Sequence, residues 1–202
     1  MREEVFNTEL NRFQDEDVRE SARIILSMLP DYFYEIPASS SGKYHPKFAL
    51  GPQGLVRHVK AAMFILEKMF TNELYGVYDS YTKDLIRMAL IVHDGLKSGY
   101  TNSGHTCNEH PVLMANFLLD NSDKLLIPKD DVNFVASLVL SHMGPWNTDR
   151  DGKAIMPKPG NYAERLVHTC DFIASFPFIN IEFDDMEIVS NFDRSKVLNK
   201  SK

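Results

Sequence analysis

The residues best suited to chemistry in this sequence are four of its seven histidines, together with two aspartates. They are His58, His93, Asp94, His110, His142 and Asp171. Imidazole nitrogens and carboxylate oxygens form the donor set that divalent transition metals favour in proteins. Each of the six falls at an end, or on the apolar face, of a stretch with helical periodicity. The set therefore predicts a site for one or two such ions in a shared interior.

The His93-Asp94 dipeptide alone carries little weight, because such pairs arise by chance. Its position is more informative, since the pair closes the most apolar stretch of the sequence, Leu85 to Asp94. Such a stretch predicts a helix buried on all sides. Burial of a polar pair there is costly unless each group finds a partner or a metal.

The elements that must position these residues are predicted to be helices, and the fold an all-α domain. Apolar spacings of three and four residues indicate helices at 55–70, 85–94, 111–119, 132–142 and 162–175. Asp130 and Asp131 are expected to cap the helix at 132–142. The Gly- and Pro-rich loop at 143–161 has room for a small hairpin.

The first helical pattern runs from Leu10 to Leu29 and is expected to break at the acidic Asp15 to Asp17 and to stop at Pro30. We divide the chain into an N-terminal helical segment at 1–40, a central domain at 41–176 and a C-terminal extension at 177–202. The pattern after Pro177 is irregular, and 193–202 reads as a polar tail.

The composition of the chain disfavours several classes of function. The chain has 202 residues and a formal net charge of −6, which fits one ordinary domain and disfavours a duplex-DNA binder. No secretory signal is visible, and no apolar run is long enough to cross a bilayer. Two cysteines without a CxxC pair form no disulfide framework. These features predict a cytoplasmic protein that does not bind membranes.

The ordered set of ligands resembles the HD-domain metal-dependent phosphohydrolase superfamily over residues 40 to 176. The segments Gly54 to His58 and His93 to Lys97 are similar to the family's first-histidine helix and its HD-x-x-K motif. His110-Pro111 is similar to its third histidine, and Asp171 to Ser175 is similar to its closing aspartate helix.

The resemblance implies a helical bundle with a binuclear metal site in its centre. His58, His93, Asp94 and Asp171 would hold the first ion, and Asp94 would bridge to a second ion held by His110 and His142. The ions would be two of the divalent Mn, Fe, Co, Ni or Zn. The implied reaction is hydrolysis of a phosphate ester in a nucleotide, dinucleotide or short oligonucleotide by a metal-activated hydroxide.

Further residues are candidates for contact with such a substrate. Besides the catalytic Asp94, Lys97 is placed as a phosphate clamp or leaving-group stabiliser. Arg57 is a candidate for contact with substrate and Lys153 for contact with phosphate, and Trp146 either stacks on a base or anchors its loop. His45 and His105 are not expected to be ligands, and His168 either supports a ligand or packs within the core.

Two other functions remain open from the sequence. HD-fold di-iron oxygenases present the same order of six ligands, so the ligands alone do not exclude oxidation of a small substrate. A regulatory protein that binds metal without catalysis is the third interpretation. Retention of six polar groups that are costly to bury, together with Lys97, argues against it.

Overall fold

The computed structural model describes residues 2–40, 42, 45–149 and 151–189. Within these residues the chain forms seven α-helices: α1 (Asn7–Leu10), α2 (Glu16–Met28), α3 (Gly54–Met69), α4 (Ser80–Val92), α5 (His110–Asp120), α6 (Lys129–Leu140) and α7 (Tyr162–Ala174). Four 3₁₀ turns lie at Arg2–Phe6, Asp31–Tyr34, Lys47–Ala49 and Ser122–Lys124. The one sheet in this part of the chain is an antiparallel pair, β1 (Phe183–Asp184) and β2 (Glu187–Ile188). The predicted all-α class is confirmed.

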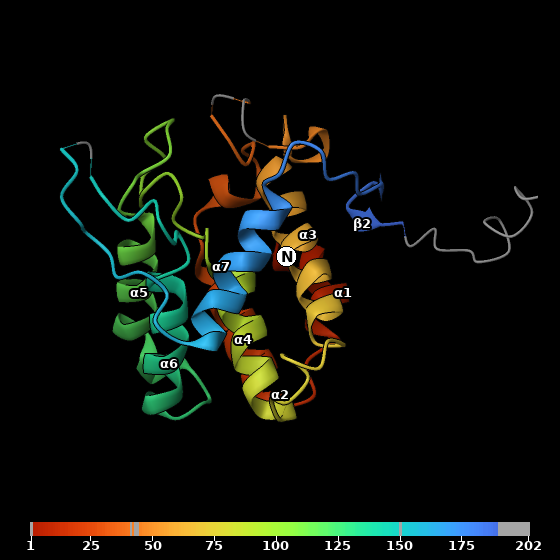
Figure 1. Ribbon diagram of the computed structural model, residues 1–202, viewed down its shortest axis with the longest axis vertical. Coiled ribbons are helices and arrows are strands. Elements are labelled where there is room, and N and C mark those ends of the chain that lie inside the picture. The colour runs from red at the N-terminus through yellow and green to blue at the C-terminus, as the bar shows by residue number, and fades with distance from the viewer. Residues whose placement is uncertain (1, 41, 43–44, 150, 190–202) are drawn as a thin grey trace, which may run out of the picture.

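Helix α4 forms the centre of the bundle and packs against α2, α3, α6 and α7 (Figure 1). Every residue from Asp84 to Val92 is buried, which confirms the prediction of a helix surrounded by protein. Its start at Ser80 is earlier than the apolar pattern indicates. The side chain of Asp79 accepts a hydrogen bond from the backbone N–H of Thr82 and so caps the polar first turn.

Of two other predicted helix starts, the one at α2 is confirmed and the one at α6 is wrong. The acidic stretch does break the first helical pattern, because the side chain of Asp15 accepts from the N–H of Val18 and starts α2. The predicted cap of α6 is wrong. This helix begins at Lys129 after Pro128, and Asp130 and Asp131 lie in its first turn. There their charges favour the helix through its dipole instead of closing its end.

Arg87, the charge that interrupts the apolar run of α4, is buried in an ion network. Its guanidinium donates to both oxygens of Glu67, at 2.7 and 3.0 Å, and to Oδ1 of Asp84, at 2.7 Å. Oδ2 of Asp84 accepts from the backbone N–H groups of Gln14 and Asp15, both at 2.8 Å. A fully buried carboxylate therefore ties the start of α2 to the central helix.

Asp84→Ala is expected to lower the free energy of unfolding by about 3–5 kcal/mol. The change leaves the buried charge of Arg87 without one of its partners and two backbone N–H groups without an acceptor. Urea denaturation followed by circular dichroism measures the effect. As a control, Glu16→Ala removes an exposed ion pair with Arg19 and should leave the midpoint unchanged. A wild-type midpoint for Asp84→Ala would contradict this role.

Two segments without clear helical periodicity form short antiparallel hairpins. Loop 143–161 contains a single bridge between Thr148 and Ala154, which confirms a small hairpin. After α7, the β1–β2 hairpin lies along α3, where the buried ammonium of Lys60 contacts both Glu9 and Glu187. The polar tail expected at 193–202 lies outside the described residues. Across the described ranges, no helix has the length and apolar character needed to span a membrane.

Candidate metal centre

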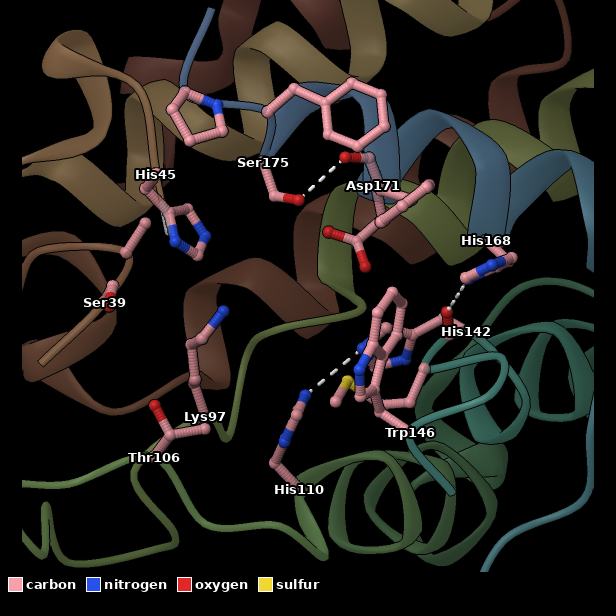
Figure 2. Close-up of a pocket in the computed structure, with 15 residues that line it drawn as sticks. Ser39, His45, Lys97, Thr106, His110, His142, Trp146, His168, Asp171 and Ser175 are labelled. Atoms are coloured by element: carbon pink, nitrogen blue, oxygen red, sulfur yellow. Dashed lines mark hydrogen bonds between the residues drawn. The ribbon is translucent and has the colours of Figure 1, made fainter. Parts of the chain in front are cut away.

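Five helices bring the six candidate ligands to one point in the interior. His58 lies near the start of α3, and Asp171 lies near the end of α7. His93 follows the last residue of α4 as its C-cap, with Asp94 after it. His110 is the first residue of α5, and His142 comes two residues after α6 ends. The expected convergence is confirmed, and Figure 2 shows three of the six, His110, His142 and Asp171, around one cavity.

The first group of donors surrounds Oδ1 of Asp171 and Oδ2 of Asp94. Nε2 of His58 lies 2.9 Å from Oδ1 of Asp171, and Nε2 of His93 lies 3.4 Å from the same oxygen. Oδ2 of Asp94 is 3.5 Å from Nε2 of His93 and 3.8 Å from Nε2 of His58. One donor atom from each residue falls within 4.8 Å of all the others, which is compact enough to hold one ion.

The second group shares Asp94 with the first. Oδ1 of Asp94 is 3.0 Å from Nε2 of His110 and 3.8 Å from Nε2 of His142. The two imidazole Nε2 atoms are 3.2 Å apart. Asp94 therefore presents one oxygen to each group, which is the arrangement that a bridging carboxylate requires. Two donor groups, each compact enough to hold a metal ion, therefore share Asp94.

Backbone carbonyls fix the orientation of three of the imidazole rings. Nδ1 of His93 lies 2.6 Å from the carbonyl of Leu90, and Nδ1 of His142 lies 2.7 Å from that of Val139. The Nδ1 atom of His110 is likewise 2.7 Å from a carbonyl, that of Cys107. In the neutral ring each Nδ1–H donates, so each Nε2 is left as a lone pair that faces the donor cluster. This tethering is typical of histidines that bind metals.

The buried atoms of this centre fit a cation. Nε2 of His93 and Oδ1 of Asp94 are buried and make no hydrogen bond within the described part of the chain. The close approach of His110 to His142 brings together two lone pairs when both tethered rings are neutral. Lone pairs crowded in this way repel one another, and a positive ion between them removes the repulsion. The residues therefore fit a divalent metal.

Electrostatics in the metal-free protein place a positive charge near the carboxylates. Burial disfavours the charge on His93, but Asp94 and Asp171 outweigh it and raise the pKa of His93 to about 10. Burial would raise the pKa of both carboxyls, yet nearby positive groups hold both well below the usual range. For Asp94 these are Lys97 first and then His93. A protonated His93 thus balances the acidic pair at neutral pH.

The pKa of His142 is shifted in the opposite direction to that of His93. Burial, followed by the neighbouring His93 and His110, lowers the pKa of His142 to about 3. This ring is therefore neutral at physiological pH and keeps its Nε2 lone pair available. A neutral imidazole is the form that coordinates a metal.

A cavity of about 540 Å³ opens onto the donors and is lined by Lys97, His110, His142 and Asp171. Nζ of Lys97 lies 2.5 Å from Oδ2 of Asp94, so this cation sits at the shared carboxylate. Trp146, for which the sequence left base stacking and loop anchoring both open, also lines the cavity. In the view of Figure 2, Lys97 and Trp146 stand on opposite sides of this space.

Two residues predicted to contact substrate are not among those that line the cavity. The guanidinium of Arg57 donates to the backbone carbonyls of Phe48, Leu50 and Pro52. It holds the turn that precedes α3, because three carbonyls in one loop match its fan of N–H donors. Lys153 is exposed in the 148–154 hairpin. The structure gives neither residue a place at the donors.

Several cavity residues could not be selected from the sequence. His45 lines the cavity, with its ring centroid 5.2 Å from that of His58, and burial is the main cause that lowers its pKa to about 3. His168 also lines it, and Nδ1 of His168 lies 2.7 Å from the carbonyl of His142. His168 therefore supports a ligand, which is one of the two roles that the sequence left open for it. Phe172 and Phe176 complete one wall and carried no signal beyond helical apolarity.

No family model matches this chain, and no solved structure matches it. The chain holds a buried cluster of four histidines and two aspartates that is able to bind metal ions and is compatible with a site of the HD type.

Proposed function

We propose that this protein is an HD-domain, metal-dependent phosphohydrolase that cleaves a phosphate ester of a nucleotide, dinucleotide or short oligonucleotide. The observation that carries the proposal is the position of Asp94. One of its oxygens faces each donor group, and Lys97 lies beside it and lines the cavity. Two metal donor groups plus one cation suit a reaction in which negative charge gathers on phosphoryl oxygens.

In the proposed reaction, the metal ions and the protein's own residues have separate roles. When bound, two divalent ions would lower the pKa of a water and neutralise phosphoryl charge. The chain itself orients the donors through the carbonyl tethers and excludes bulk water by burying them. Lys97 reaches the cavity from the same turn as Asp94, so its ammonium can move from Asp94 to a phosphoryl oxygen when substrate arrives.

The direct test is hydrolysis by protein stripped of metal and reloaded with Mn²⁺, Fe²⁺, Co²⁺, Ni²⁺ or Zn²⁺. Bis-p-nitrophenyl phosphate and a panel of nucleotides serve as substrates. We expect metal-dependent release of p-nitrophenol, and of phosphate or a nucleoside monophosphate from at least one nucleotide. No turnover with any metal would overturn the proposal. Two irons per chain, with product formed only in the presence of oxygen, would favour an oxygenase instead.

Lys97→Met is expected to lower kcat/KM by about 100-fold while both ions remain bound, because removal of one group that stabilises transition-state charge costs roughly this much. Steady-state kinetics and metal analysis by mass spectrometry measure the two effects. Lys153→Met is the matched control, since it removes an exposed lysine outside the cavity. Equal losses in both variants would contradict the assignment of Lys97.

A further inference from the structure

The cavity beside the metal donors has two chemically different ends. The donor end carries His110, His142, Asp171 and the ammonium of Lys97. The remaining wall is mainly apolar and includes three aromatic side chains, Trp146, Phe172 and Phe176. A ligand that fills this space must therefore combine a charged group with a large apolar surface.

The aromatic side chains form a continuous wall. The ring centroids of Trp146 and Phe172 are 5.2 Å apart, and those of Phe172 and Phe176 are 4.5 Å apart. The ring of His168 lies nearly parallel to that of Phe172, at 14° and 5.7 Å. About half of the surface of Trp146 remains exposed, at 53%, so part of this side chain is open to contact with a ligand. A partly exposed tryptophan at the edge of such a wall suits a planar ring.

The backbone fixes Trp146 relative to the metal donors. It lies four residues after His142, and its N–H donates to the carbonyl of Met143. The intervening Gly144 has φ +59°, and a Cβ there would fall 2.3 Å from Cε1 of His168. The His168 ring in turn contacts the carbonyl of His142. This close packing fixes the backbone between His142 and Trp146.

The positive charge that lines the cavity limits the number of phosphoryl groups that a ligand can carry. Lys97 is the only lysine or arginine among the cavity-lining residues that the structure describes. One phosphoryl group can meet Lys97 and the donor end together. Further phosphates would have to lie against the aromatic wall, where burial of an unpaired charge is costly. The volume of about 540 Å³ suits one small molecule.

From these observations we infer that the cavity binds an ester with one phosphoryl group and one planar ring system, of the kind that a nucleoside monophosphate carries. The phosphoryl group would lie at Lys97 and the metal donors, and the ring would stack on Trp146. This inference rests on the proposed function for the position of the phosphoryl group. It adds the class of substrate, and it names Trp146 as the residue that selects for the ring.

Binding can be tested separately from catalysis. Isothermal titration of the Zn²⁺-loaded protein should show AMP binding at least about 10-fold more tightly than ribose 5-phosphate, which lacks the ring, because stacking on an aromatic side chain contributes about this factor. ATP should also bind at least about 10-fold more weakly than AMP. Since Trp146 is the only tryptophan, AMP should quench the intrinsic fluorescence and ribose 5-phosphate should not. Equal affinity for AMP and either competitor would overturn the inference.

Variants distinguish stacking from a general effect on folding. Trp146→Ala should weaken AMP binding by about 10-fold and leave ribose 5-phosphate binding unchanged. Trp146→Phe should restore most of the loss, because it returns an aromatic face. Tyr162→Ala, which removes an exposed ring outside the cavity, should bind AMP as the wild type does. Unchanged AMP binding by Trp146→Ala would overturn the inference. Tight AMP binding without hydrolysis of any ester would instead overturn the proposed function alone.

Discussion

Asp94→Asn is expected to remove both metal ions and to lower phosphodiester hydrolysis by about 1,000-fold or more. The amide has nearly the shape of the carboxylate, but it lacks the negative charge that both donor groups share. One Asp94 oxygen lies 3.0 Å from Nε2 of His110, and the other lies 3.5 Å from Nε2 of His93. A single substitution therefore weakens both groups at once. Metal content per chain and the rate with bis-p-nitrophenyl phosphate are the measurements.

Asp171→Asn provides the discriminating comparison, because Asp171 belongs to the first donor group only. We expect this variant to retain about one ion per chain, held by Asp94, His110 and His142. Asp184→Asn, an exposed change in β1, should keep full metal content and activity. Two ions retained in a folded Asp94→Asn protein would contradict the bridging role of Asp94. Circular dichroism establishes that each variant is folded.

Metal loading is expected to raise the melting temperature of the stripped protein by about 10 °C. An ion present at about 1,000 times its dissociation constant stabilises the folded state by about 4 kcal/mol, and each kcal/mol shifts the melting temperature of a chain this long by about 2–4 °C. Differential scanning calorimetry with and without Mn²⁺ or Zn²⁺ measures the shift. Asp94→Asn is the control, and it should show no comparable increase.

The size of this metal effect should grow as the pH rises above about 6.5. In the metal-free protein the pKa of His93 is about 10, above its unfolded value of 6.5. Protonation of His93 therefore contributes stability that is complete below pH 6.5 and is lost as the pH rises towards 10, by up to about 1.4 kcal/mol per pH unit. An ion takes the place of this proton, so the loaded protein should not show the loss. Parallel declines of both forms between pH 7 and 9 would contradict this account.

Below pH 6.5, the stability of the metal-free protein changes with pH in the opposite direction. The folded-state pKa values of His142 and His45 are about 3, below the unfolded value of 6.5. The stability that they contribute is present above pH 6.5 and is lost as the pH falls from there towards 3. The metal-free protein should therefore be most stable near pH 6.5.

The arrangement of helices follows closely from the sequence, because apolar spacing decides which face of a helix is buried. This holds for α3 and for the fully surrounded α4. The starts of helices were harder to predict. Asp79 and Asp15 cap their helices through side-chain hydrogen bonds, whereas Asp130 and Asp131 have the same residue type and do not. The position in the helix separates these cases, because Asp15 and Asp79 are N-cap residues whereas Asp130 and Asp131 lie inside the first turn of α6.

The candidate metal ligands could be selected because their residue types and their places at helix ends are visible in one sequence. The residues around them could not. Arg57 directly precedes the ligand His58, and Lys97 follows Asp94 by three residues. Arg57 binds loop carbonyls, whereas Lys97 faces the cavity. The direction in which each side chain points depends on the packing of distant elements. The buried network of Arg87 was missed for the same reason.

The contacts that hold His93, His110 and His142 against backbone carbonyls affect which metal ions the centre binds most tightly. Each ring loses its rotational freedom when the protein folds, before any ion is present. The centre therefore acts as a preformed receptor, and ion binding requires little further ordering of these side chains. A receptor of this kind selects among cations by ionic radius and by softness towards nitrogen, because its rings cannot shift to suit a poorly matched ion. Ca²⁺ and Mg²⁺, which favour oxygen donors, should compete weakly with Zn²⁺ here.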